Sequence, residues 1–391
     1  MVSNTNGIER IVDISYNKFH NTTVAYSSDG YGYALATNTD RVYDWSASCV
    51  FYTYRTKDIS SDLNNPYREY TYNRIGKYHL EKVFNDETKV YDINRVQRPK
   101  MIIQGERTDA KVAITYYDSN NTINPVKFRY GVAKGSNVDG GLIGVSSTYS
   151  GADTSENNDP SLIGGSGKNF HIVASKNTKF RSGDYSAVGM TPKGYAVVAW
   201  YDASVRRLCY SYNENPSSAV VGGVWQTNAI YLDEAYTGWH VDMAVDSDGG
   251  IHIAYYNSAK GDLKYAYLSS YNDTNPTVVT VDSYLSVGTN ITINVRKEGD
   301  KQIPYIYYYN ASATQTPNSI KVAWQNDVTT LRNGAVSDKF TGAWEAMTIP
   351  TQNIPSDATV CGGIPTTGTY GNKVILGYMS DTGYEKAVLK K

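Results

Sequence analysis

Apolar and polar side chains alternate along most of this chain in short runs, which is the pattern of β-strands with one buried face. Residues 251–268, IHIAYYNSAKGDLKYAYL, alternate, break at Ser-Ala-Lys-Gly-Asp, and alternate again. This segment predicts two strands joined by a tight turn. A close copy, AVVAWYDASVRRLCYSYN, occupies residues 196–213. Two copies of one hairpin indicate a repeat architecture.

Six copies of the hairpin can be aligned along the chain. Their paired strands lie at 31–38 and 49–54, 112–118 and 126–130, 197–202 and 208–212, 253–257 and 263–267, 306–310 and 320–324, and 374–380 and 384–389. A short strand precedes each hairpin, at 22–30, 99–106, 185–194, 241–250, 290–299 and 357–365. Another follows most hairpins, at 78–84, 170–177, 225–234, 277–285 and 343–350. Repeated sets of four strands predict the blades of a β-propeller.

The sixth unit ends without an outer strand, whereas an unassigned strand, GIERIVDIS at 7–15, precedes the first unit. An N-terminal strand that completes the last blade would close the ring and protect two sheet edges. We therefore predict an all-β fold, a six-bladed β-propeller of four-stranded antiparallel blades, with residues 1–391 as a single domain. Seven blades is the alternative, because residues 55–97 and 131–170 are long enough to contain further strands.

Composition narrows the classes of partner. The 37 Lys and Arg residues balance 38 Asp and Glu, which argues against a nucleic-acid partner or a polybasic membrane surface. No segment approaches the roughly 20 apolar residues of a membrane helix. The chain has 36 Tyr against 7 Phe, and Tyr suits strands and surfaces that are both apolar and hydrogen-bonding. Cys49, Cys209 and Cys361 are too far apart for a metal motif, so we interpret them as buried free thiols.

A Ser-Asp-Gly turn at 247–249, followed by HIAYY at 252–256 and LKYA at 263–266, resembles the repeats of sialidase-like (BNR-type) β-propellers of secreted bacterial proteins. The resemblance implies an extracellular or cell-surface protein that handles glycans or other surface ligands. The N-terminal residues MVSNTNGIER show no signal-peptide pattern. The Asp-box consensus and the Phe-Arg-Ile-Pro motif of sialidases are absent, so the resemblance assigns no catalytic residue.

The inner strand of each predicted blade starts at one mouth of the central channel. Alignment of the six units puts Asn21, Arg98, Asp184, His240, Asn290 and Asp357 near this mouth, flanked by His20, Arg181, Tyr185, Tyr236, Trp239 and Asp242. Aromatic rings can stack on sugar faces, while carboxylates and arginines hydrogen-bond sugar hydroxyls. We predict a ligand-binding site made of Arg98, Asp184, Tyr185, Tyr236, Trp239, His240 and Asp242. The structural alternative is a solvated channel rim.

Trp239-His240-x-Asp242 is the sharpest local cluster for catalysis. His240 could act as a general base and Asp242 could set its tautomer, provided that a regular strand puts both on one face. With Arg98 or Arg181 on a uronate and Tyr236 as the acid, the cluster would suit a lyase. A glycosidase would instead need two carboxylates among Asp184, Asp242 and Asp357, about 5–10 Å apart.

Three other motifs are better explained as structure. Asp246-Ser-Asp248-Gly-Gly250 resembles part of a calcium loop but lacks the remaining ligands, so we interpret it as a tight turn. His252 falls on a blade-packing position and predicts a core histidine. In Tyr255-Tyr256-Asn257, one ring should face each neighbouring blade and the Asn should start the turn. We predict no metal and no cofactor.

These observations favour a non-catalytic extracellular propeller that binds a glycan or a surface protein at the channel mouth. The first alternative is a glycan-active enzyme on the same fold, a glycoside hydrolase or a polysaccharide lyase that uses His240. The second is a structural subunit of a larger surface or phage assembly, which would use the blade edges.

Overall fold

The computed structural model describes residues 19–26, 32–38, 50–55, 72–73, 77–78, 84–85, 90–91, 96–104, 111–118, 126–132, 170–171, 182–203, 205–216, 230–298, 301–310, 319–325, 343–348, 360–361, 373–380 and 383–390. The regular elements in these residues are β-strands. Within the same residues, no helix is long and apolar enough to cross a membrane.

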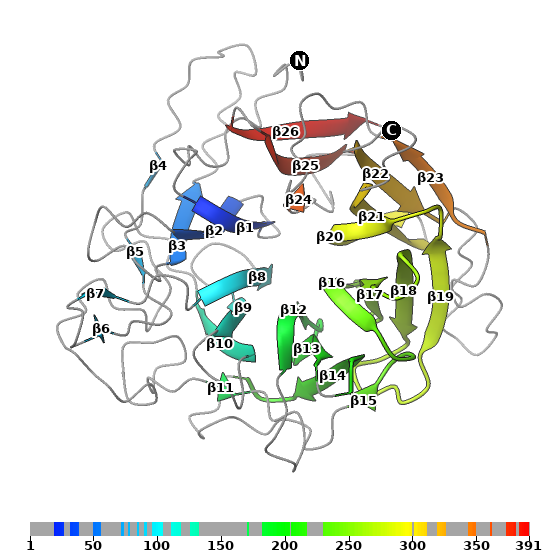
Figure 1. Ribbon diagram of the computed structural model, residues 1–391. Helices are drawn as coiled ribbons and strands as arrows, with labels where there is room; N and C mark the ends of the chain where they lie inside the picture. The colour runs from blue at the N-terminus through cyan, green and yellow to red at the C-terminus, as the bar shows by residue number, and fades with distance from the viewer. Residues whose placement is uncertain are drawn as a thin grey trace.

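The strands form sheets that stand around a common axis (Figure 1). The first sheet holds β1 (Phe19–Tyr26), β2 (Gly32–Asn38), β3 (Val50–Arg55), β4 (Tyr72–Asn73) and β5 (Lys77–Tyr78). The second holds β8 (Val96–Gln104), β9 (Lys111–Asp118), β10 (Val126–Val132) and β11 (Phe170–His171). The third holds β12 (Ser182–Met190), β13 (Ala196–Asp202), β14 (Arg207–Asn213) and β15 (Ile230–Tyr231).

The chain continues in the same way through the later sheets. The fourth holds β16 (Thr237–Val245), β17 (Ile251–Asn257), β18 (Asp262–Leu268) and β19 (Thr277–Asp282). The fifth holds β20 (Val287–Glu298), β21 (Lys301–Asn310), β22 (Ser319–Trp324) and β23 (Glu345–Thr348). The sixth holds β24 (Val360–Cys361), β25 (Lys373–Ser380) and β26 (Gly383–Lys390), and a small separate sheet pairs β6 (Phe84–Asn85) with β7 (Val90–Tyr91).

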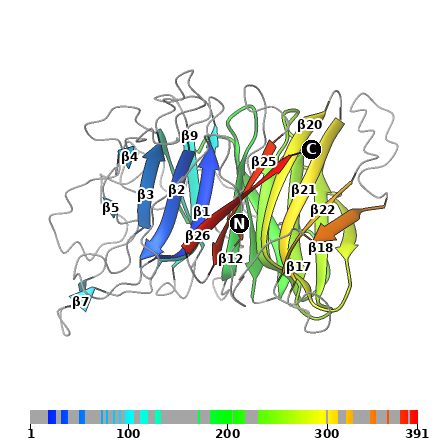
Figure 2. The same ribbon diagram turned by 90° about the horizontal axis from the view of Figure 1, so that it is seen from above.

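The inner strands connect the sheets into a ring. β1, β8, β12, β16, β20 and β24 each contact the next in this order, and β24 also contacts β1. The side view shows the sheets packed beside one another with their strands upright (Figure 2). The predicted all-β propeller of antiparallel, mostly four-stranded sheets is confirmed. The predicted closing strand, residues 7–15, lies outside the described residues.

The six predicted hairpins are confirmed as β2–β3, β9–β10, β13–β14, β17–β18, β21–β22 and β25–β26. Two fourth strands end earlier than predicted, β15 at Tyr231 and β19 at Asp282, while the residues that follow β11 (Phe170–His171) lie outside the described residues. The fourth strand predicted at 78–84 overlaps β5 at Tyr78, which pairs with Val50 of β3, and residues 79–83 lie outside the described residues. An outer strand has one partner and little burial, as in the exposed β23, so its alternation of apolar and polar residues is weak.

The described core lies between neighbouring sheets. One apolar cluster joins the third sheet to the fourth and another joins the fourth to the fifth. As predicted, the two tyrosines of β17 face opposite neighbours: Tyr255 donates to Asp233 Oδ2 at 2.7 Å, and the Tyr256 hydroxyl lies 3.3 Å from Ser286 Oγ. The Asn257 side chain accepts the amide hydrogen of Ala259 at 3.0 Å and starts the turn, also as predicted.

Each inner strand from β1 to β20 contains an irregularity near its start. Its pairing with the second strand shifts and resumes at Thr23, Lys100, Ser186, Asp242 and Thr292, respectively. The aligned positions Asn21, Arg98, Asp184, His240 and Asn290 each lie two residues before that point. His240 and Asn290 have left-handed backbones, with φ of 51° and 49°. The regular strand required for His240 and Asp242 to share a face is therefore absent from β16.

The inner strands run in the same direction. Contacts between them join residues at similar distances from the strand start: Tyr185 in β12 meets His240 in β16, and Lys100 in β8 meets Ile291 in β20. The end of the ring at which β8, β12, β16 and β20 begin is called the top face below. It carries the β13–β14 and β17–β18 turns and the loops that precede β16 and β20.

Candidate functional site

An aromatic cluster surrounds Trp239 at the start of β16. The Trp239 side chain is 36% exposed, and its ring stacks on Tyr185 of the neighbouring sheet with centroids 5.8 Å apart and planes 27° apart. Tyr201 meets the Trp239 ring edge-on at 5.9 Å. Residues from two adjacent sheets therefore hold one open indole in place.

His240 lies against the same cluster. Its Nε2 is 3.3 Å from the Tyr185 hydroxyl, and the ring centroids are 4.5 Å apart. Tyr256 packs edge-on against the His240 ring, with ring centroids 6.1 Å apart. The cluster combines an exposed ring face with polar groups that can exchange a proton or share a hydrogen bond.

Exposed apolar side chains concentrate on the top face. The described part of the chain has six large hydrophobic side chains that are exposed: Val205, Tyr236, Trp239, Tyr284, Leu285 and Met347. All except Met347 lie in the β13–β14 turn, in the loops before β16 and β20, or at the start of β16. Large exposed apolar groups gathered on one surface are typical of an interaction site.

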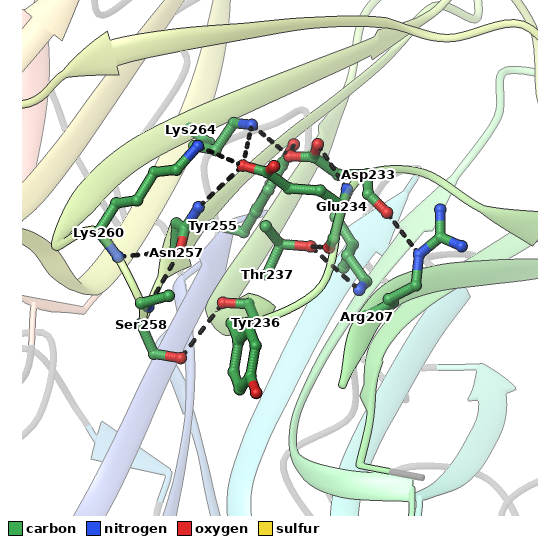
Figure 3. A network of polar contacts seen from close by, with 12 residues as sticks. Arg207, Asp233, Glu234, Tyr236, Thr237, Tyr255, Asn257, Ser258, Lys260 and Lys264 are labelled. Atoms are coloured by element: carbon green, nitrogen blue, oxygen red, sulfur yellow. Dashed lines mark hydrogen bonds and ion pairs between the residues drawn. The ribbon is translucent and has the colours of Figure 1, made fainter. Parts of the chain in front are cut away.

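A polar network fixes the loop that leads into β16 (Figure 3). Asp233 Oδ2 accepts hydrogen bonds from the Tyr255 hydroxyl at 2.7 Å and from Lys264 Nζ at 2.6 Å. Burial and the Asp233 charge raise the pKa of Tyr255 well above its usual range, so this hydroxyl remains a donor. Lys260 and Lys264 both point toward Glu234, and the hydrogen bond from Lys260 at 2.8 Å lowers the pKa of that carboxyl.

The same network ties the loop to its neighbours through the backbone. The Ser258 amide donates to the Tyr236 carbonyl at 2.9 Å, and Arg207 Nε donates to the Asp233 carbonyl at 2.6 Å. Thr237 Oγ1 donates to the Glu234 carbonyl at 2.6 Å. Because the loop is held at several points, the position of Trp239 is set before any ligand binds.

Asp242 contacts the interior of the ring. Its Oδ1 lies 3.3 Å from Nζ of Lys100, which comes from β8, two sheets away. Its Oδ2 accepts the Ile293 amide hydrogen at 2.9 Å, and Lys100 also donates to the Ile291 carbonyl at 3.2 Å. The ion pair joins β8 to β16, and the two hydrogen bonds add β20, at the level where strand pairing resumes, so these contacts of Asp242 are structural.

Tyr236 and Arg206 form a second exposed group on the top face. Arg206 Nη1 donates to the Tyr236 hydroxyl at 2.7 Å, and the guanidinium carbon lies 5.2 Å from the ring centroid. Both residues have left-handed backbones, with φ of 57° for Arg206 and 67° for Tyr236. The Tyr236 side chain is 41% exposed.

The predicted site residues are thus distributed as follows. Tyr185, Trp239 and His240 are in direct contact, Tyr236 is three residues before Trp239, and Asp242 faces Lys100. β8 and β12 carry Arg98 and Asp184 at the same level as His240, but their side chains lie outside the described residues. Arg181 and Asp357 lie outside them altogether.

The motifs interpreted as structural are structural. Asp246 Oδ1 accepts the amide hydrogens of Asp248 at 2.9 Å and Gly250 at 2.8 Å, which makes a tight turn. His252 is fully buried. Cys209 is buried and free, as predicted. In the described residues, no group of three or more His, Cys, Asp and Glu side chains could hold a metal ion.

Four residues that contact the predicted site were not assigned to it from the sequence, namely Lys100, Tyr201, Arg206 and Tyr256. Arg206 had a visible signal, because the aligned hairpins AVVAWYDASVRRLCYSYN and IHIAYYNSAKGDLKYAYL have Arg206 where the second copy has Gly261. No sequence pattern indicated Lys100, because its partner, Asp242, comes from a sheet two places away in the ring.

The sequence matches no protein-family profile and no curated protein. In structure, the chain is similar to the α-L-arabinanase of Penicillium chrysogenum complexed with arabinobiose, with 12% identity, a TM-score of 0.54, and 96% of this chain and 95% of that chain covered. It is also similar to a Hadza microbial sialidase, with 10% identity, a TM-score of 0.53, and 95% of this chain and 66% of that chain covered. For the NanB sialidase of Streptococcus pneumoniae, the identity is 10%, the TM-score is 0.52, and the coverage is 99% and 71%. The expected resemblance to sialidase-like propellers is confirmed at the level of the fold.

Proposed function

We propose that this protein is a non-catalytic propeller that binds a glycan at the channel mouth on its top face. The observation that carries the proposal is the exposed Trp239 ring, stacked on Tyr185 and bordered by His240. An indole held open by neighbouring rings offers a flat apolar face, and the adjacent hydroxyl and imidazole can bond sugar hydroxyls. The solved structures with this fold include an arabinanase bound to arabinobiose, which supports a carbohydrate ligand.

A glycan array, followed by titration calorimetry on the best ligand, tests the proposal. Trp239→Ala should weaken binding by about 1 kcal/mol or more, because it removes the stacking face. Met347→Ala is the matched control, since Met347 is also exposed but lies on β23, the outer strand of the fifth sheet. Binding to no glycan, or equal binding by the wild type and Trp239→Ala, would overturn the proposal.

A glycan-active enzyme is the second candidate, and the 3.3 Å contact between Tyr185 and His240 favours it. A hydroxyl and an imidazole at this distance can act as an acid–base pair. His240→Ala separates the two functions. A binding protein should lose at most about 0.5–1.5 kcal/mol of affinity. A lyase or hydrolase should lose on the order of 100-fold in rate while it still binds substrate.

We further propose that the ring has six blades in a single domain and that residues 7–15 complete the last blade. The contact between β24 and β1, and a sixth sheet with three described strands, support this closure. An extracellular or cell-surface location fits a glycan ligand and the resemblance to secreted bacterial propellers.

A further inference from the structure

We propose that Arg206 and Tyr236 form an anion-binding subsite beside Trp239, and that the ligand of the top face is an acidic glycan with a carboxylate or sulfate group. This inference rests on the proposed glycan-binding function and specifies the class of ligand. It has four supports: a comparison between two repeats, the orientation of the Arg206 guanidinium, the charge balance of the top face, and the position of the pair beside the aromatic cluster.

The repeat comparison shows that Arg206 occupies a position suited to glycine. Arg206 immediately precedes β14, and Gly261 occupies the same place before β18, with φ of 79°. The Arg206 carbonyl accepts the amide hydrogen of Tyr236, just before β16, and the Gly261 carbonyl accepts that of Val287, the first residue of β20. A left-handed backbone is strained for a residue with a side chain. The chain therefore places an exposed cation where the fold alone favours glycine.

The guanidinium of Arg206 is held in one orientation. It lies over the Tyr236 ring and donates one hydrogen bond to the Tyr236 hydroxyl. An exposed arginine ordinarily loses rotamer freedom when it binds a ligand, and this arrangement has already restricted it. A planar guanidinium whose remaining N–H groups have no partner among the described residues suits bidentate binding of a carboxylate or a sulfate.

Four described lysines near the top face have carboxylate partners, whereas Arg206 has none among the described residues. Lys264 pairs with Asp233, Lys260 with Glu234, Lys321 with Asp282, and Lys100 with Asp242. Their charges are therefore already balanced within the protein. Arg206 contacts a neutral tyrosine, so its charge remains available to an anionic ligand.

The pair is close enough to the aromatic cluster for one ligand to contact both. Tyr236 and Trp239 are three residues apart, so their Cα atoms are separated by at most about 11 Å. Tyr201, whose ring meets Trp239 at 5.9 Å, stands one residue before the end of β13, which leads into the turn of Arg206. A short oligosaccharide stacked on Trp239 can present its acidic group to Arg206.

The test compares glycans that differ only in charge: polygalacturonate against its methyl ester, and chondroitin sulfate against desulfated chondroitin. The wild type should bind the acidic member of at least one pair roughly tenfold or more tightly, with an affinity that falls as salt rises. Arg206→Gly should abolish this preference and its salt dependence. The melting temperature should be unchanged or higher, because glycine relieves the left-handed strain.

Two further variants separate charge from geometry. Arg206→Lys retains the charge but lacks the planar fork, so it should recover only part of the preference. Tyr236→Phe keeps the ring and removes the hydroxyl that fixes Nη1, so Tyr236 acts as a positioning residue and its loss should give an intermediate preference. A wild type that binds both members of each pair equally, or an unchanged preference in Arg206→Gly, overturns the anion subsite and leaves glycan binding standing. Failure to bind these probes and every glycan on an array of acidic and neutral sugars overturns both.

Discussion

His252 shows how a single buried side chain can satisfy two partners at once. Its Nε2 lies 3.0 Å from Asp246 Oδ2, and its Nδ1 lies 2.6 Å from the Tyr265 hydroxyl. A carboxylate can only accept, so Nε2 donates to Asp246, and in the neutral ring Nδ1 accepts from Tyr265. All three side chains are fully or almost fully buried, so the histidine connects a turn to the core.

Replacement of this histidine should therefore lower stability. In His252→Leu, Asp246 and Tyr265 each lose a buried hydrogen-bond partner, which should cost about 2–4 kcal/mol in the free energy of unfolding. Urea denaturation measures this loss. An unchanged unfolding midpoint would show that water or another group replaces the imidazole.

The Asp246 turn also predicts the response to chelation. Asp246 Oδ1 accepts two backbone amide hydrogens and Oδ2 accepts from His252, so the turn forms without a cation. The melting temperature should be the same with and without EDTA. A fall of several degrees that calcium reverses would show that a metal contributes to this loop.

At the scale of the element, a repeated latch joins neighbouring sheets. Asp233 follows the outer strand of the third sheet and binds Tyr255 and Lys264 of the fourth. Asp282 ends β19 and binds Tyr308 and Lys321 of the fifth sheet in the same way. The third sheet has Trp200 and Cys209 at the paired Tyr and Lys positions, and both are fully buried. The Asp–Tyr–Lys contact therefore joins the third sheet to the fourth and the fourth to the fifth, whereas buried Trp and Cys side chains occupy the equivalent positions of the third sheet.

Breaking the latch at Asp282 should destabilise the protein and change its acid sensitivity. Burial opposes ionisation of Asp282, but hydrogen bonds from Lys321 and Tyr308 outweigh it and lower its pKa. A lowered pKa in the folded state stabilises the fold above the unfolded value of about 4, and this stabilisation is lost as pH falls through the folded value. Asp282→Asn should lose about 2 kcal/mol or more near neutral pH, because Lys321 is left buried without a carboxylate.

The matched control is Lys260→Gln, which removes an exposed partner of Glu234 and should leave the unfolding midpoint unchanged. Unfolding followed between pH 7 and pH 3 should show a smaller acid-dependent loss in Asp282→Asn than in the wild type. Equal midpoints for Asp282→Asn and the wild type at pH 7 would contradict the latch as a source of stability.

At the scale of the whole molecule, stability depends on how the ring closes. Each described interface between sheets buries apolar side chains, so a gap in the ring would expose two faces at once. The Lys100–Asp242 ion pair adds a contact across the interior that no adjacent pair of sheets could provide.

Removal of residues 1–15 tests the proposed closure. If residues 7–15 complete the last blade, the truncation exposes a strand edge and an apolar face, and the protein should melt at a lower temperature or aggregate. Light scattering and thermal denaturation measure both effects. A monomeric truncation with the melting temperature of the full chain would exclude this closure.

The sequence alone determined the six hairpins, the strands that precede them and the level of the inner-strand residues, but not the bounds of the outer strands. Apolar and polar residues alternate along a strand because one face of the strand is buried. This pattern is local and recurs in each repeat, so the hairpin of β17 and β18 could be aligned with its copies. The same alignment placed Arg98, Asp184 and His240 at one level of their inner strands, although their strand pairing is irregular there.

Only the tertiary structure decided which of these residues meet. Trp239 contacts Tyr185 because of the way the fourth sheet is rotated against the third. The arrangement of the sheets also brings Asp242 to Lys100, whereas the sequence pattern had placed Asp242 on one face with His240. A sheet-to-sheet contact joins residues far apart in sequence, and no local pattern encodes their distance. The register between β16 and β17 likewise shifts between Trp239 and Asp242. Such an irregularity changes the direction of the side chains beside it, so their directions cannot be read from the alternation in the sequence.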